Sequence, residues 1–112
     1  MPHEEALQLE VDLHEFASAH ASGATVLDVR NPDEYEAGHV PGAKLIPLGD
    51  LANRQEEIPE GDPVYVICAV GGRSLAAVRA MVQAGYRAVS VAGGTKAWIE
   101  QGRPYITGPD ER

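Results

Sequence analysis

The chain has 112 residues, 44% of them hydrophobic, which suits one compact domain that buries about two-thirds of its unfolded surface. Its net charge of −8 disfavours nucleic acid and membrane surfaces as partners. No run approaches the roughly 20 apolar residues of a membrane span, and the acidic N-terminus does not resemble a targeting segment. A single cysteine excludes an internal disulfide and suits a reducing compartment. We therefore expect a cytoplasmic protein.

The first half of the chain alternates apolar, β-branched runs with helical segments. Asp12 is a predicted N-cap, and Glu15 three residues later completes a capping-box pattern. Asn31 also suits an N-cap, with Pro32 at the first helical position. In chain order we expect a strand at 9–11, a helix from 12 to 22, a strand at 25–29, a short helix from 31 to 37, a strand at 43–46 and a helix within 47–58.

The second half contains the strongest predicted strand, which is nearly continuous in apolar residues and should be buried on both faces. The helix after it places Leu75, Val78 and Val82 on one face. We expect a strand at 63–68, a helix from 74 to 84, a strand at 88–91, a helix from 94 to 102 and a loosely held polar tail from 104 to 112. This alternation predicts an α/β fold, a central parallel sheet of about five strands with helices on both faces.

Cys68 ends the strongest strand, where a parallel α/β sheet binds its ligands. A thiolate there faces the N-terminus of the next helix, whose free N–H groups and dipole stabilise negative charge. The glycines of the loop allow successive N–H groups to point inward as an anion cradle, and Arg73 adds a fixed positive charge. We predict that Cys68 is a nucleophile and that the substrate-binding loop consists of Ala69, Val70, Gly71, Gly72 and Arg73.

Two alternatives are open at this point. Free cysteine is among the most buried residue types, so a lone Cys68 also fits a structural core position. Loops of this kind also bind phosphate, so the segment alone does not determine the substrate.

The loop resembles the active loop of the rhodanese family, in which four residues separate a cysteine from an arginine, as in Cys68-Ala69-Val70-Gly71-Gly72-Arg73. Leu27-Asp28-Val29-Arg30 is similar to the family's strand that ends in Asp-x-Arg, and residues 34–43 are similar to its glycine-histidine turn. Ile46-Pro47 and Gly93-Gly94 with Trp98 match later positions. The resemblance runs from about Val11 to Pro104 and implies a single rhodanese-like domain over 1–112, with its core at about 11–104.

The resemblance implies a sulfurtransferase of the thiosulfate:cyanide class, which needs no cofactor. The Cys68 thiolate would attack the sulfane sulfur of a donor and become a persulfide. A thiol, cyanide or a protein acceptor would then take the sulfur. No histidine lies near Cys68 in the sequence, so activation would depend on the loop amides, the helix dipole and Arg73.

Several other residues have supporting roles in this interpretation. We expect Asp28 and Arg30 to brace the active loop by an ion pair or hydrogen bonds, and Ser74, at the start of the next helix, also to support the site. His39, in a Pro-Gly turn, is expected to make structural hydrogen bonds, and Trp98 to pack in the core. Gly93-Gly94 would permit a close backbone approach beside the site. The four histidines, His3, His14, His20 and His39, lack metal-ligand spacing, so we expect no metal.

Two other functions compete with this one. A cysteine phosphatase or arsenate reductase has five residues between cysteine and arginine, whereas Cys68 and Arg73 are separated by four, a tighter cradle that suits sulfur. A non-catalytic rhodanese-like binding module often lacks the cysteine that is present here.

One feature of the loop bears on the donor. Many relatives that use thiosulfate carry a basic or polar residue after the cysteine, but Ala69 and Val70 are apolar. With the acidic surface, this predicts weak use of thiosulfate and a preference for a thiol persulfide or a protein donor.

Overall fold

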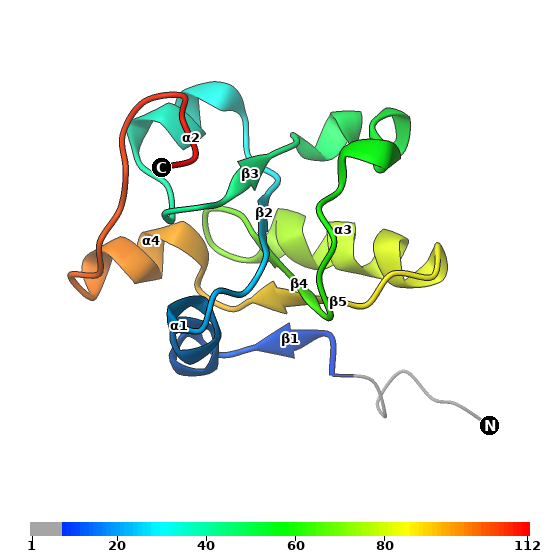
Figure 1. The fold of residues 1–112 in the computed structure, drawn as a ribbon, viewed down its shortest axis with the longest axis horizontal. Coiled ribbons are helices and arrows are strands. Elements are labelled where there is room, and N and C mark those ends of the chain that lie inside the picture. The colour runs from blue at the N-terminus through cyan, green and yellow to red at the C-terminus, as the bar shows by residue number, and fades with distance from the viewer. Residues whose placement is uncertain (1–7) are drawn as a thin grey trace.

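A computed structural model describes residues 8–112, and residues 1–7, including His3, lie outside the described part. Parallel strands form one sheet in the order β1-β5-β4-β2-β3 (Figure 1). The strands are β1 (Glu10–Val11), β2 (Val26–Asp28), β3 (Lys44–Leu45), β4 (Val64–Ile67) and β5 (Ala88–Val91). The predicted α/β class, with its parallel sheet of about five strands, is confirmed.

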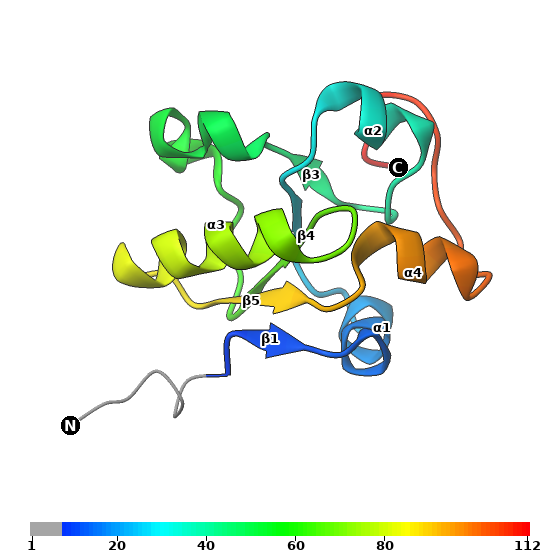
Figure 2. The same ribbon diagram turned by 180° about the vertical axis from the view of Figure 1, so that it is seen from behind.

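Helices cover both faces of the sheet, as predicted. Figure 2 shows α3 (Gly72–Gln83) in front of the sheet, and the 3₁₀ segments η2 (Leu48–Asn53) and η3 (Gln55–Glu57) adjoin it on this face. The other face carries α1 (Leu13–Ala21), α2 (Pro32–Ala37) and α4 (Gly94–Glu100). The core is therefore divided into two apolar clusters, one on each side of the sheet.

Strand β4 lies inside the sheet, between β5 and β2, and its side chains alternate between the two clusters. Val64 and Val66 pack in the cluster under α3, and Cys68 continues this series just beyond the strand. Ile67 points to the other cluster, which also contains Phe16 and Trp98. The period-two alternation of a strand thus fixes the face on which the Cys68 side chain lies.

The predicted N-caps Asp12 and Asn31 are confirmed, whereas the capping box expected at Asp12 and Glu15 is reduced to a single side-chain bond and the helix expected from 74 begins at Gly72. The backbone N–H of Glu15 donates to Asp12 Oδ1 at 2.7 Å, which satisfies one free donor of α1. In α2 the capping box is complete, because the Asn31 backbone N–H donates to the Glu34 carboxylate at 3.0 Å. Pro32 occupies the first helical position, where its missing N–H costs nothing.

Two expectations about helices were wrong in detail. The segment 47–58 is not one helix but the separate turns η2 and η3, because Arg54 leaves the helical region at φ −128°, ψ 31°. Only Leu51 of these segments is buried, so little packing favours a regular helix there. In α3, Leu75 and Val82 are half-buried, and the buried face consists of Ser74, Ala77, Val78 and Met81.

The tail from Pro104 was expected to be loose, and this was wrong. His39 and Ile106 form a reciprocal antiparallel bridge at 2.9 Å in both directions. The Gly42 N–H donates to Glu111 O, and the Gly108 N–H donates to Glu36 O. Figures 1 and 2 show this red C-terminal segment running from α4 to α2. The buried His39 side chain makes structural hydrogen bonds, as predicted.

Within residues 8–112, no helix combines the length and the apolar character needed to cross a membrane.

Candidate active site

The loop 68–73 lies where β4 ends and α3 begins, at the carboxyl ends of the strands (Figure 2). Gly71 adopts φ +118°, a left-handed conformation that favours glycine and turns the chain into α3. Its backbone N–H points back at the thiol, at 3.1 Å from Cys68 Sγ. Gly72 is already the first residue of α3. The predicted inward-curled loop is therefore present, and Gly71 provides the special backbone geometry.

The Cys68 side chain is buried, with 1% of the residue exposed. Burial raises the pKa of this thiol, because a charge is disfavoured away from water. Hydrogen bonds from the Ser74 hydroxyl and from the backbone N–H groups of Ser74, Gly71 and Val70 act in the opposite direction and outweigh it. The net result is a pKa below the ordinary value of a cysteine. The loop amides and one hydroxyl therefore shift Cys68 toward the thiolate form, in the predicted direction.

Two buried serines form a short hydroxyl chain that ends at the thiol. Ser74 Oγ lies 3.4 Å from Cys68 Sγ and 3.1 Å from Gly71 O, and it lies 2.7 Å from Ser90 Oγ of β5. If Ser90 donates to Ser74, the single Ser74 hydroxyl hydrogen is available for the sulfur or for Gly71 O. A thiol can donate to Ser74 Oγ, whereas a thiolate accepts from it. The chain can therefore adapt to either charge state of Cys68.

Arg73 does not project freely into the loop, because it is paired with Glu34 of α2. Its two terminal nitrogens donate to the two carboxylate oxygens of Glu34 at 2.7 and 2.8 Å. The Arg73 hydrogen bonds are the main reason that the pKa of Glu34 falls to about 2. Glu34 in turn raises the pKa of Arg73, and the Cys68 charge adds to this effect. The fixed positive charge expected beside Cys68 is present but already has an anionic partner.

Asp28 and Arg30 form a buried ion pair with a different target from the predicted one. Arg30 Nη2 lies 2.8 Å from Asp28 Oδ2, and both side chains are almost completely buried. Arg30 also donates to Glu34 O, inside α2, and to Gly38 O, at its C-cap. The pair thus braces α2, the helix that carries Glu34, and its link to the Cys68 loop passes through the Glu34–Arg73 pair.

The first turn of α4 holds the other side of the loop. The Thr95 N–H donates to Cys68 O at 2.8 Å, and the Lys96 N–H donates to Ala69 O at 3.0 Å. Gly94 permits this contact, because a Cβ at its position would lie 2.6 Å from Cys68 O. The predicted close approach at Gly93-Gly94 is confirmed. Val70, at the tip of the loop, is 64% exposed, so the loop presents an apolar side chain to solvent.

The structure brings two further residues to this site that the sequence did not assign to it. Glu34 was placed only in the short helix 31–37 and in the turn-like segment 34–43, and Ser90 only in the strand 88–91. A polar side chain within an apolar strand was the available signal for Ser90. No local signal shows that Glu34 pairs with an arginine 39 residues away.

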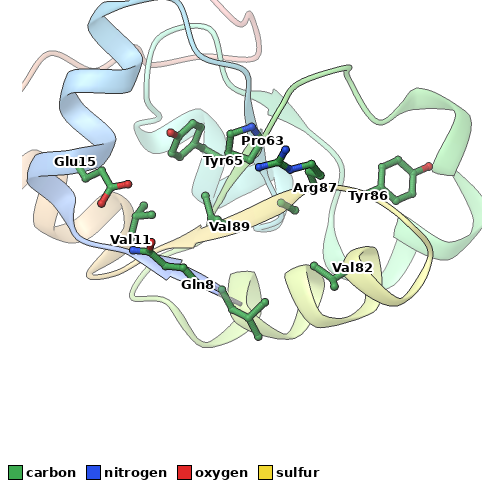
Figure 3. A pocket seen from close by; sticks show the side chains of 11 residues that line it. Gln8, Val11, Glu15, Pro63, Tyr65, Val82, Tyr86, Arg87 and Val89 are labelled. Atoms are coloured by element: carbon green, nitrogen blue, oxygen red, sulfur yellow. The ribbon is translucent and has the colours of Figure 1, made fainter. Parts of the chain in front are cut away.

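A pocket of about 560 Å³ lies elsewhere, beside β1 and the amino ends of β4 and β5 (Figure 3). It is lined by Gln8, Glu15, Arg87, two tyrosines and apolar neighbours, and it contains no residue of the Cys68 loop. Among residues 8–112 there is also no group of three His, Cys, Asp or Glu side chains that could hold a metal ion. Cys68 and its loop remain the candidate site.

Comparison with known proteins places this geometry in a family. Residues 12–101 match the family model described as a rhodanese-like domain. The chain is 33% identical to thiosulfate sulfurtransferase 18 of Arabidopsis thaliana over 118 residues, which covers 92% of the chain and 87% of that protein. It is 43% identical over 74 residues to YrkF of Bacillus subtilis, covering 65% of the chain but only 40% of YrkF, whose name describes a sulfur carrier.

Solved structures agree with this assignment. A rhodanese-related protein from Thermoplasma volcanium superimposes with a TM-score of 0.81 at 33% identity, covering 88% of this chain and 98% of that one. The Cys68 loop, the Asp28–Arg30 pair and the His39 turn all lie inside the matched range 12–101. This chain belongs to the rhodanese-like domain family.

Proposed function

We propose that this chain is a single-domain sulfurtransferase that carries a sulfane sulfur as a persulfide on Cys68. The observation that carries the proposal is the set of donors around Sγ. The Gly71 N–H donates to the sulfur at 3.1 Å, and the Ser74 hydroxyl, in hydrogen-bond contact at 3.4 Å, can donate to it once it is a thiolate. These contacts and the neighbouring amides lower the pKa of Cys68 despite burial. A thiolate is the nucleophilic form of cysteine, so these donors favour attack on a donor sulfur.

The proposed first step is a displacement at sulfur. The Cys68 thiolate attacks the outer sulfur of thiosulfate, an S–S bond forms to Cys68, and the S–S bond within thiosulfate breaks. Sulfite leaves with the electron pair, and Cys68 becomes a persulfide anion. The loop amides that face Sγ would also stabilise negative charge on the persulfide.

In the second step, a nucleophile removes the outer sulfur. Cyanide attacks that sulfur, thiocyanate leaves, and the Cys68 thiolate is restored, so charge and electrons balance. A thiol acceptor would give a new persulfide in the same way. A protein acceptor fits the exposed Val70, which places an apolar side chain at the entrance to the loop.

A non-catalytic binding module is the second candidate, and the 1% exposure of Cys68 favours it. A donor reaches a sulfur so deeply buried only if the loop opens. The hydroxyl chain from Ser90 through Ser74 to the thiol supports the catalytic alternative, because an inert core cysteine needs no such donors. A phosphatase is disfavoured by the family assignment and by the short spacing from Cys68 to Arg73.

Intact mass spectrometry tests the proposal. The protein is incubated with thiosulfate and, separately, with glutathione persulfide. We expect the mass to increase by that of one sulfur atom with at least one donor, and cyanide to reverse this increase. Cys68→Ser should show no gain. An unchanged mass with every sulfane donor would reject the sulfurtransferase and favour the binding module.

A further inference from the structure

The Cys68 loop contains one charged side chain, Arg73, because the other residues from Ala69 to Gly72 are uncharged. Any attraction that a charged side chain of the loop exerts on an anionic donor therefore comes from this guanidinium, in addition to the dipoles of the loop amides. In the structure, both of its terminal nitrogens donate to Glu34 at 2.7 and 2.8 Å. Such a two-point contact fixes the guanidinium in direction as well as in charge.

Glu34 is itself held in place for this contact. Its Oε1 accepts the Asn31 backbone N–H at 3.0 Å, and its backbone carbonyl accepts a hydrogen bond from buried Arg30. The pair also lies at the surface, with 36% of the Arg73 side chain and 32% of the Glu34 side chain exposed. Arg73 is thus accessible to a donor molecule but is turned toward α2.

The charges near the sulfur follow from this arrangement. A Cys68 thiolate and the Glu34 carboxylate are negative, and Arg73 is positive, so the group carries one net negative charge. Glu34, with a pKa of about 2, remains ionised throughout the neutral range. A dianion such as thiosulfate meets more repulsion here than a donor with fewer charges.

From this geometry we propose that Glu34 determines donor preference, by holding Arg73 away from the donor and so selecting against dianionic sulfane donors. The inference rests on the proposed sulfur transfer at Cys68. It makes Glu34 a specificity-determining residue that acts through Arg73 rather than a group that touches the reacting sulfur.

The test compares two donors in three proteins. Thiosulfate is the dianionic donor, and benzenethiosulfonate is a monoanionic donor with the same transferable sulfur. Both are assayed with cyanide in the native protein, in Glu34→Gln and in Glu36→Gln. Glu36 lies on the same helix with an exposed side chain, so its replacement removes the same charge without touching Arg73.

We expect Glu34→Gln to raise kcat/KM by about tenfold for thiosulfate and by about threefold for benzenethiosulfonate, because the electrostatic effect scales with donor charge. Glu36→Gln should change neither value by more than about twofold, since an exposed charge is screened. In an Arg73→Gln background, Glu34→Gln should lose most of its effect. High salt should reduce the difference between native protein and Glu34→Gln.

The inference would be overturned if the ratio of kcat/KM for thiosulfate to kcat/KM for benzenethiosulfonate were the same in Glu34→Gln and Glu36→Gln. A parallel loss of activity with both donors in Glu34→Gln would also overturn it. If Glu34→Gln does not fold, Glu34→Asp replaces it, because its shorter carboxylate cannot maintain the two-point contact, and the ratio should shift in the same direction. The mass test separates the two proposals. If native protein gains no sulfur from any donor, the proposed function fails, whereas sulfur uptake with an unchanged donor ratio rejects only the role of Glu34.

Discussion

The His39 imidazole connects the C-terminal segment to the body of the protein, with Nε2 at 2.7 Å from the carbonyl oxygen of Asp110. Its other nitrogen, Nδ1, lies 2.8 Å from Tyr35 O, and the ring stacks on that of Tyr35 at 3.7 Å. A carbonyl oxygen only accepts hydrogen bonds, so each of these contacts depends on a hydrogen at the ring nitrogen that makes it.

This relationship gives the first prediction. His39→Phe keeps an aromatic ring against Tyr35 but removes both hydrogen bonds, so the contact with Asp110 is lost. The amides of Gly42 and Gly108, which donate to Glu111 O and Glu36 O, should then exchange faster with solvent, as measured by hydrogen–deuterium exchange. His14→Phe, at an exposed position of α1, is the control. Unchanged exchange at both amides in His39→Phe would contradict the role of His39 in holding the tail.

The second prediction concerns the serine chain that ends at Cys68. Replacing Ser74 or Ser90 by alanine should raise the pKa of the thiol, because the thiolate loses a donor directly or through its neighbour. A hydrogen bond to a charged group worth about 1.5 kcal/mol corresponds to roughly a tenfold lower thiolate fraction. Ser74→Ala should have the larger effect, and Ser90→Ala a smaller one in the same direction.

The measurement is the rate of iodoacetamide alkylation of Cys68 as a function of pH. In both variants the profile should move to higher pH, while the limiting rate at high pH changes little. Ser18→Ala, at an exposed position of α1, is the matched control. A changed limiting rate with an unmoved profile would show that the serines only pack around the thiol.

The third prediction concerns the buried Asp28–Arg30 pair. Arg30→Met leaves the Asp28 carboxylate buried without its partner and removes the braces at Glu34 O and Gly38 O, so it should cost about 3–5 kcal/mol of unfolding free energy. Arg87→Met, in an ion pair whose side chains are 74% and 72% exposed, should cost less than about 1 kcal/mol. Urea denaturation measures the loss of unfolding free energy in both variants. Similar losses in the two would argue that the Asp28–Arg30 pair does not brace α2.

Local patterns explain which parts of this fold and site were predictable. The helix caps at Asp12 and Asn31 depend on residues three positions apart, and the strand before Cys68 is identified by its own apolar run. The position of Cys68 at the carboxyl end of a parallel strand then follows from the topology of α/β sheets.

The remaining features depend on contacts between distant segments. Arg73 pairs with Glu34, 39 residues away in the sequence, and His39 contacts Asp110, 71 residues away. Neither partner carries a local sequence signal of its contact. The polar composition of the tail therefore suggested mobility, although its backbone groups pair with the His39 turn. In the segment 47–58 the chain forms short 3₁₀ turns in place of the expected helix, because only Leu51 is buried there and little packing favours a regular helix.

The last prediction uses two glycines with similar backbone conformations but different surroundings. Gly94 has φ +62° and Gly102 has φ +75°, so alanine at either position carries the cost of a left-handed conformation, about 1–2 kcal/mol. Around Gly102 a Cβ meets nothing within 4 Å, whereas at Gly94 it would lie 2.6 Å from Cys68 O. Gly94→Ala should therefore cost about 1–3 kcal/mol more than Gly102→Ala, because backbone must move.

Because this movement occurs at the Cys68 loop, comparing Gly94→Ala with Gly102→Ala tests function as well as stability. The amides of Thr95 and Lys96 hold Cys68 O and Ala69 O, so a methyl group at position 94 pushes the loop away from α4 and disturbs the amides around Sγ. Sulfur uptake by folded Gly94→Ala should fall well below that of Gly102→Ala, measured by intact mass at a temperature where both are native. Equal uptake would mean that the loop does not depend on α4 for its geometry.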